Sequence, residues 1–319
     1  MSEIVLITGG LGYIGGRLAH HLATRTGMRV RLGTRNPAQK TPPELAGCEL
    51  THCDLASRAS LEAACRNVRF LVHLAALNEI DSAQHPDQAI AINTGGTLRL
   101  AQSAIGAGVE RVLYFSTAHV YGAPLLGEIS ERVIPRPVHP YAYTHKAAED
   151  ILLAAGREKK FTAIVFRLAN AFGPPIRAGV ERWTLLVNDL CRQAATQRKL
   201  VLKTAGLQPR NFITLTDVCE AAAHFLGLEE AELGDGVFNI GGRRSMTVLE
   251  MTELLAQRCE KVLGFRPLIE RAAALGPGEI QTLHYSIAKA QAAGFQPKDA
   301  LEAELDGALS FCGRAFAPK

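Results

Sequence analysis

The stretch that decides the fold is residues 8–16, Thr-Gly-Gly-Leu-Gly-Tyr-Ile-Gly-Gly. An apolar run over 4–7 precedes it, and apolar residues at helical spacing follow it over 13–26. A strand, a glycine turn and a helix in this order form the context in which such glycines bind a dinucleotide. The stretch therefore predicts a phosphate-binding turn at the first strand of a larger sheet.

Each glycine of the G-x-x-G-x-x-G spacing has a physical task. Gly9 can adopt a positive φ, Gly12 lets the backbone approach a pyrophosphate, and Gly15 lets the helix pack closely on the strand. The free amides and the dipole at the start of the helix favour the phosphate charge. We predict that the backbone of Tyr13 and Ile14 also lines this site.

Composition excludes several classes of protein. The 319 residues carry a net charge of only +4, which does not indicate binding to nucleic acid or to a membrane surface. No apolar run approaches the roughly 20 residues of a membrane span. The seven cysteines form no C-x-x-C or Cys/His pattern, so we expect no metal site and no disulfide framework. We expect a cytoplasmic protein with reduced thiols and no signal peptide.

Short apolar strands alternate with helical patterns along the first half of the chain. The expected strands are 3–7, 28–32, 48–52, 69–74 and 111–116, and the expected helices are 13–26, 58–66, 86–108 and 142–157. This alternation predicts an α/β fold with a doubly wound parallel sheet, whose ligands bind beyond the carboxyl ends of the strands. We expect a dinucleotide-binding domain over 1–169, to which 211–242 returns. Residues 170–319 should form mainly a smaller, mostly helical substrate lobe.

The residues after the second and third strands bear on the cofactor. Gly33 stands where an acid would bind both ribose hydroxyls of NAD, and Arg35 follows two residues later. A guanidinium there favours the 2′-phosphate of NADP, unless Arg35 is an ordinary solvated side chain. Asp54 and Leu55 are expected to bracket an adenine, or Asp54 simply caps the next helix.

Small residues and one asparagine follow the fourth strand. Ala75 and Ala76 would let a cofactor pass close to the backbone, whereas His73 is expected to be a core histidine with a satisfied ring. Asn93 precedes paired glycines inside a helical pattern, which is costly in a helix interior. We expect Asn93 to have a structural task or to contact the cofactor.

Together with these features, motifs later in the chain make the sequence resemble the extended short-chain dehydrogenase/reductase family, the nucleotide-sugar epimerases, dehydratases and ketoreductases. The shared motifs cover most of the chain: 8–16, Asp54-Leu55, 73–76, Asn93 to Thr97, Ser116-Thr117 with Tyr121-Gly122, Tyr141, 167–174, 210–218 and 238–242. The resemblance implies a seven-stranded Rossmann lobe with a C-terminal lobe that holds a sugar nucleotide.

The resemblance also implies catalytic roles. Thr117 would hydrogen-bond the reacting oxygen, and Tyr141 would transfer the proton. In the family a lysine four residues after this tyrosine lowers its pKa and binds the nicotinamide ribose. Here that position is His145, whereas Lys146 points about 100° round the helix. A histidine can still hydrogen-bond the ribose, but its charge at neutral pH is only partial.

Two further departures bear on the substrate. The 4,6-dehydratases of the family have Asp-Glu directly after the threonine, but this chain has Ala118 and His119, which disfavours elimination of water. By resemblance, Asn170 and Arg210 would bind the substrate's sugar or phosphates, and Ala118 and His119 would also line the substrate site. The arginine and Gly-Asp that the family often has near the end of this lobe correspond to 275–279, with the arginine absent or displaced to Arg271.

The leading hypothesis is an oxidoreductase that uses NADP, or NAD, on a nucleotide-linked sugar, with hydride transfer at C4. The closest alternative is a 4-epimerase that retains its cofactor. His145 also leaves open a cofactor-binding protein with weak catalysis, and related enzymes act on sterol or flavonoid ketones, although Arg210 speaks against an apolar ligand. By analogy we expect a homodimer formed through helices 86–108 and 142–157.

Overall fold

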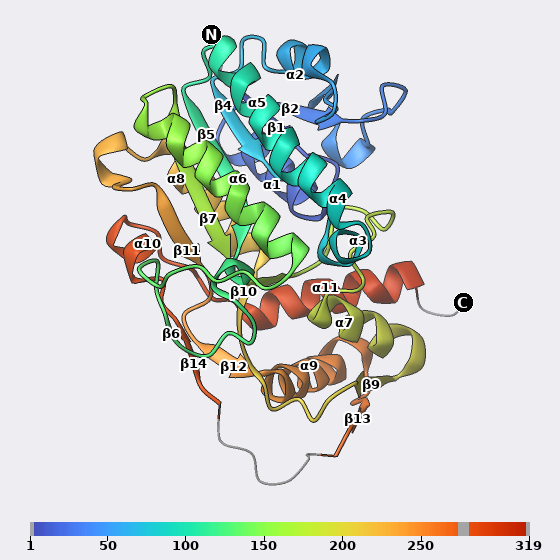
Figure 1. Cartoon of the computed structure of the whole chain (residues 1–319). Coiled ribbons are helices and arrows are strands. Elements are labelled where there is room, and N and C mark those ends of the chain that lie inside the picture. Colours follow the sequence, from blue (N-terminus) through green and yellow to red (C-terminus); the bar gives the residue numbers. More distant parts are fainter. Residues whose placement is uncertain (1–2, 274–280, 317–319) are drawn as a thin grey trace.

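A computed structural model describes residues 3–273 and 281–316. A seven-stranded sheet with the order β11-β7-β5-β4-β1-β2-β3 lies at its centre (Figure 1), and all its neighbouring strands are parallel. The order confirms the predicted doubly wound α/β fold. Its strands are β1 (Ile4–Thr8), β2 (Arg29–Thr34), β3 (Glu49–His52), β4 (Phe70–His73), β5 (Arg111–Thr117), β7 (Thr162–Leu168) and β11 (Val237–Ile240).

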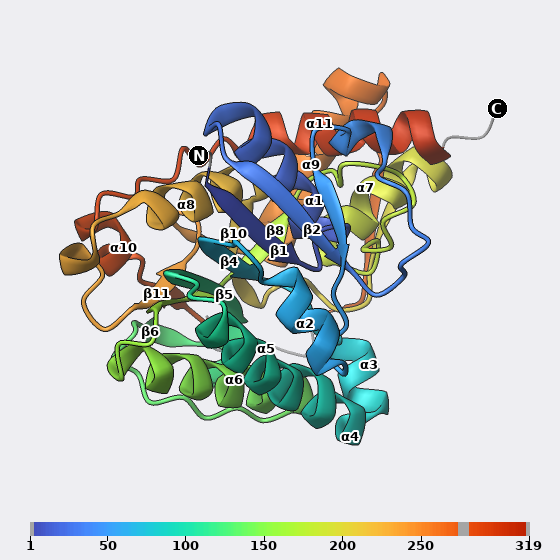
Figure 2. The same cartoon turned by 90° about the horizontal axis from the view of Figure 1, so that it is seen from above.

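Helices cover both faces of this sheet (Figure 2). On one face pack α2 (Arg58–Ala64), α5 (Gly95–Gly106) and α6 (Pro140–Arg157), and on the other α1 (Tyr13–Arg25), α8 (Leu215–Gly227) and α10 (Ala288–Ala292). Alternate strand residues point to the two faces, so Leu6 and Ile7 are both fully buried, in different clusters. Burial of each such side chain contributes about 1.5–3 kcal/mol, which explains the near-continuous apolar strands.

A third apolar cluster lies beyond the carboxyl ends of the strands. Its helices are α7 (Leu186–Gln197), α9 (Val248–Leu263) and α11 (Leu301–Phe316). Trp183 belongs to this cluster, with its ring centroid 5.9 Å from that of Phe311, so it is a core residue. Three small sheets complete the fold over the described residues. The first contains β8 (Asn170–Phe172), β10 (Pro209–Thr214) and β12 (Ser245–Thr247). The second pairs β9 (Lys199–Leu202) with β13 (Leu268–Arg271), and the third pairs β6 (Gly127–Ile129) with β14 (Leu283–Tyr285).

The expected helix over 86–108 is interrupted. It consists of α4 (Pro86–Ala89), a π-helical turn η2 (Ile90–Thr94) and α5, and α3 (Glu79–Gln84) precedes it. The wide turn carries Asn93, whose side chain is bonded to neighbouring segments instead of facing solvent. The strands β12, β13 and β14 also break the region expected to be helical after residue 243. Single 3-10 turns form at η1 (Pro43–Leu45), η3 (Ala118–Tyr121) and η4 (Glu230–Glu232).

Some sequence predictions concern thiols, membranes and the end of the second lobe. All seven cysteines are free and buried. Within 3–273 and 281–316, the helices are too short or too polar to cross a bilayer. The stretch 275–279, compared above with the family's Gly-Asp motif, lies outside the described residues.

Candidate active site

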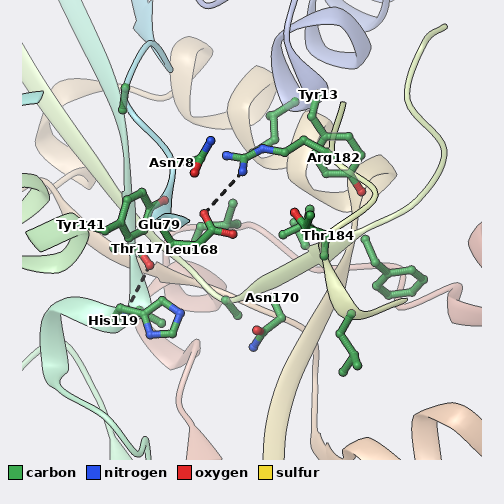
Figure 3. Close-up of a pocket in the computed structure, with 18 of the residues that line it drawn as sticks. Tyr13, Asn78, Glu79, Thr117, His119, Tyr141, Leu168, Asn170, Arg182 and Thr184 are labelled. Carbon is green, nitrogen blue, oxygen red and sulfur yellow. Dashed lines mark hydrogen bonds and ion pairs between the residues drawn. The ribbon is translucent and has the colours of Figure 1, made fainter. Parts of the chain in front are cut away.

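A cavity of about 1450 Å³ runs along the carboxyl ends of the central strands and continues between β8, β10 and α7. Pockets for one small ligand usually measure roughly 300–1,000 Å³, so this cavity has room for two ligands side by side. One end is formed by the glycine turn, the other by residues of the second lobe. Figure 3 shows Tyr141 and Thr117 on one side of the cavity, with Asn170 and Thr184 across from them.

The glycine turn is built as the sequence predicts. Gly9 has φ +66°, and a Cβ there would lie 3.1 Å from the amide nitrogen of Ala75. A Cβ on Gly15 would lie 2.3 Å from the carbonyl oxygen of Gly9, so the start of α1 packs directly on the turn. No side chain caps α1 at Gly12. This bare backbone cradle fits a dinucleotide pyrophosphate, and Ile14 lines the cavity beside it.

The residues expected around an adenosine also line this end of the cavity. They are Arg35, Asp54, Leu55, Ala75 and Ala76. Asp54 does not cap α2, since Ser57 occupies the N-cap, and its Oδ1 accepts instead from the amide of Ala56 at 3.0 Å. The alternative prediction, that Asp54 caps the helix after the third strand, was therefore wrong.

Gly33 requires a different explanation from the one the sequence offered. A Cβ at Gly33 would lie 2.8 Å from the Cβ of Cys53, so close packing of β2 on Cys53 already demands a glycine. The absence of an acid at position 33 is thus no sign of the cofactor. The argument for a 2′-phosphate rests on Arg35 alone, which is exposed and lines the cavity.

Tyr13 lines the cavity, but its hydroxyl is committed to structure. It donates to the carbonyl oxygen of Gly173 at 2.9 Å and lies 3.3 Å from Oδ1 of Asn188. Burial raises the pKa of this phenol far above its usual range. The side chain therefore fastens the start of α1 to the second lobe, which leaves the backbone of Tyr13 for a ligand.

Behind the cavity wall, His73 and Asn93 have satisfied side chains. His73 is 1% exposed, with Nδ1 2.7 Å from Oγ1 of Thr8 and Nε2 2.9 Å from Oγ1 of Thr97, as expected of a core histidine. Asn93 accepts from the amide of Leu77 at 2.8 Å and donates to Oγ1 of Thr144 at 3.1 Å. The structure does not bring the Asn93 side chain to the cavity surface. Its task is to tie the loop after β4 to α6, which corrects the expected cofactor contact.

Thr117 and Tyr141 meet in the middle of the cavity. Thr117 ends β5, and its Oγ1 accepts from the amide of His119 at 3.2 Å (Figure 3). Tyr141 stands in the first turn of α6, which His139 caps. Burial, with a smaller contribution from the nearby Glu79 carboxylate, raises the pKa of Tyr141 to about 12. An unaided Tyr141 would therefore be a weak base at neutral pH.

His145 lies one turn further along α6, behind Tyr141. The two ring centroids are 4.3 Å apart, and His145 is only 3% exposed. Burial lowers the pKa of His145 to about 3, and the neighbouring histidines act in the same direction. The ring is thus neutral at neutral pH, so it does not supply the partial charge considered from the sequence. Lys146 points elsewhere, as expected, and pairs with Asp150.

On the substrate side, the four expected residues Ala118, His119, Asn170 and Arg210 line the cavity. Nδ1 of His119 and Nε of Arg210 are buried and have no hydrogen-bond partner in the part of the chain that the structure describes. Arg210 also lies 3.4 Å from Oδ1 of Asn170. A guanidinium whose Nε–H has no partner among the described residues, together with an imidazole nitrogen without one, suits a ligand rich in hydroxyl and phosphate oxygens.

Two pairs of residues at the site were missed from the sequence. Arg182 is not a solvated surface arginine: it pairs with Glu79 at 3.4 Å inside the cavity (Figure 3). Tyr114 contacts His145 through its hydroxyl. Only the fold brings these pairs together, because their members are 103 and 31 residues apart. The acidic Glu79 at the first position of α3 was the one available signal, and it was not distinctive.

Comparisons with known proteins agree with this geometry. A family model described as NAD dependent epimerase/dehydratase family matches residues 5–241. A mouse dTDP-D-glucose 4,6-dehydratase is 32% identical over 195 residues, which cover 60% of this chain and about half (52%) of the relative's length. The low-salt glycan biosynthesis protein Agl12 of Haloferax volcanii is 28% identical over 96% of this chain and 97% of its own. The solved structure of MoeE5 with UDP-glucuronic acid and NAD superposes with a TM-score of 0.78 at 26% identity, covering 98% and 99% of the two chains.

Proposed function

The chain belongs to the NAD dependent epimerase/dehydratase family, and from that premise we propose that it is an oxidoreductase acting at C4 of a nucleotide-linked sugar. The observation that carries the proposal is the meeting of Tyr141 and Thr117 at the middle of a cavity with a dinucleotide cradle at one end. Its other end presents Arg210 and Asn170, whose chemistry suits the phosphates and hydroxyls of a sugar nucleotide.

Each residue then has a defined task. When bound, the nicotinamide supplies the hydride exchange with the sugar carbon. The Tyr141 hydroxyl gives its proton to the sugar oxygen during reduction, and the Tyr141 phenolate takes the proton from the sugar hydroxyl during oxidation. Thr117 orients the same oxygen by a hydrogen bond. Neutral His145 offers a hydrogen bond without a charge.

We place elimination of water outside this activity. Ala118 is a buried methyl group and His119 a neutral imidazole, because burial lowers the pKa of His119. Neither provides the carboxyl pair that the resemblance assigns to 4,6-dehydratases. The dehydratase relative therefore shares a lineage with this chain but, in our proposal, not its reaction.

A thermal-shift screen of nucleotide sugars, with NAD and NADP in separate arms, tests the proposal. A ligand at 100 times its Kd stabilises the folded state by about 2.7 kcal/mol, which raises Tm by a few degrees. Hits are then assayed for turnover. Equal consumption of NADPH and a keto-sugar supports the reductase. A sugar epimer without net cofactor consumption supports the 4-epimerase, and binding without turnover leaves a cofactor-binding protein.

We further propose that the cofactor is NADP, because Arg35 faces the adenosine end of the cavity. Arg35→Ala is expected to weaken NADP binding by about 10- to 100-fold, since a hydrogen bond to a charged group contributes about 1.5–3 kcal/mol. The Kd for NAD should change by less than about twofold, because NAD has no 2′-phosphate and loses no charged hydrogen bond. Isothermal calorimetry gives both values, and exposed Arg314 on α11, mutated to alanine, is the control. Equal losses for both cofactors would contradict the assignment.

The pH dependence of oxidation follows from the high pKa of Tyr141. With that pKa near 12, the ionised fraction grows as pH rises, so kcat/KM should climb from pH 7 to 10 without a plateau. His145→Lys adds a positive charge beside the phenol and should lower its pKa by about one to three pH units. The rate at pH 7 then increases, and at the largest of these shifts the profile begins to level off near pH 10. His145→Gln, which stays neutral, should retain the wild-type profile; a plateau below pH 8 in the wild type would refute the neutral-histidine account.

We also propose a homodimer whose interface is formed by the helical segment over 86–108, which includes α5, and by α6. Ile90, Leu98 and Ile105 are 52%, 44% and 37% exposed and are spaced by about two helical turns, so they share one face. Sedimentation should give twice the chain mass for the wild type and a monomer for Leu98→Glu. A monomeric wild type would remove this proposal.

A further inference from the structure

The Tyr114 side chain joins the central sheet to His145. Tyr114 lies on β5 with its hydroxyl 2.6 Å from Nδ1 of His145. The residues are 2% and 3% exposed, and their rings are stacked with centroids 5.7 Å apart at 25°. This contact is the one hydrogen bond made by either side chain within the described residues.

The proton in this hydrogen bond belongs to the phenol. Burial raises the pKa of Tyr114 well above its usual value, so its hydroxyl keeps the proton, and His145 is a neutral ring with one N–H. A proton on Nδ1 would occupy the Tyr114 oxygen and leave the phenol proton without an acceptor. A proton on Nε2 lets Tyr114 donate to the Nδ1 lone pair. Either arrangement leaves one donor of the buried pair without a partner among the described residues. An imidazole nitrogen is a stronger hydrogen-bond acceptor than a phenol oxygen, so the arrangement in which Tyr114 donates to Nδ1, the Nε2–H tautomer, is favoured.

This tautomer leaves one donor free. Nε2 of His145 is buried and has no partner in the part of the chain described here. The ring lies against Tyr141, which faces the cavity. A buried N–H without an acceptor is rare in a folded protein, so a ligand oxygen is the natural partner.

We propose that Tyr114 is a positioning residue that fixes His145 as the Nε2–H tautomer, so that this N–H donates to a ribose hydroxyl of the nicotinamide dinucleotide beside Tyr141. The inference rests on the proposed function for the identity of the ligand. A lysine at position 145 would carry three donors and need no such partner. A histidine presents a donor on a chosen side only when its other nitrogen is engaged, which is what the Tyr114 hydroxyl does.

Nitrogen NMR on protein labelled with ¹⁵N-histidine tests the tautomer without any turnover. The His145 signals are assigned by their loss in His145→Gln. We expect a protonated Nε2 and an unprotonated Nδ1 in the wild type, and a tautomer mixture in Tyr114→Phe. Tyr143→Phe, which deletes an exposed phenol hydroxyl on the same helix, should leave the spectrum unchanged. A proton on Nδ1 in the wild type, or an unchanged Tyr114→Phe spectrum, overturns the proposal.

A binding arm tests the ligand. Addition of NADP should shift the Nε2 resonance, and Tyr114→Phe should raise the Kd for NADP by about three- to tenfold, the effect of one hydrogen bond. In a His145→Lys background the same substitution should have no effect, because lysine has no tautomer. Equal effects in both backgrounds would make Tyr114 merely structural and overturn the proposal.

The two claims can fail separately. A wild-type spectrum with the expected tautomer and an NADP shift, together with no turnover of any nucleotide sugar, supports this inference and contradicts the proposed function. The expected tautomer without a shift on NADP addition overturns the ribose contact while the enzymatic proposal is judged by the turnover assay.

Discussion

Tyr141→Phe is expected to lower kcat by about 10²–10⁴-fold, the contribution of a positioned general acid or base. Its hydroxyl has no hydrogen-bond partner within the described residues, and it stands beside Thr117 in the cavity (Figure 3). Removal of one oxygen atom therefore deletes the proton donor without disturbing the fold. Steady-state kinetics with the substrate identified by the screen measure the effect.

The control for this prediction is Tyr143→Phe. This variant deletes a phenol hydroxyl two residues away, on the exposed side of α6, and should keep the wild-type kcat. Calorimetry should show that Tyr141→Phe still binds NADP with nearly unchanged affinity. A Tyr141→Phe variant that retains more than about a tenth of the activity would exclude the phenol as general acid or base.

Arg167→Met is expected to destabilise the fold by about 3–5 kcal/mol, because it leaves a buried charge without its partner. Arg167 on β7 and Glu149 on α6 are 5% and 0% exposed, with Nη2 2.8 Å from Oε2. Ser116 donates to the same carboxylate at 2.5 Å. This network connects β5, α6 and β7, the elements that carry Thr117 and Tyr141, so it supports the site indirectly.

Urea unfolding followed by circular dichroism measures this loss. The matched control is Arg58→Met, which breaks an ion pair with Glu62 on the surface of α2, where the partners are 63% and 57% exposed. That pair should contribute less than about 0.5 kcal/mol. Replacing both Arg167 and Glu149 by apolar residues should recover much of the stability lost in the single variant. Equal losses for Arg167→Met and Arg58→Met would show that the buried pair has no special weight.

The sequence predicted what depends on local pattern. The glycine turn, the strand positions and the apolar faces follow from spacing over a few residues, and the structure has them within one or two residues. The line of residues after each strand was also predictable, because the carboxyl ends of parallel strands meet at one edge of the sheet. That rule placed Arg35, Asp54 and Thr117 on one cavity.

What the sequence left undetermined depends on long-range contacts. Gly33 appeared to report on the cofactor, but a glycine is required there by the packing of Cys53, which directly follows the neighbouring strand β3. His145 appeared partly charged, but burial against Tyr114 and Tyr141 makes it neutral. Charge states and tautomers depend on desolvation and on partners far along the chain, so spacing alone does not determine them.

A crystal structure with NADP and the nucleotide sugar found by the screen tests the central claim most directly. We predict the pyrophosphate on the turn at Gly9 and Gly12, the nicotinamide beside Tyr141, and Nε2 of His145 within hydrogen-bonding distance of its ribose. The Tyr141 hydroxyl should then contact the sugar oxygen at C4. A dinucleotide bound away from the glycine turn, or a Tyr141 hydroxyl remote from both ligands, would contradict the account.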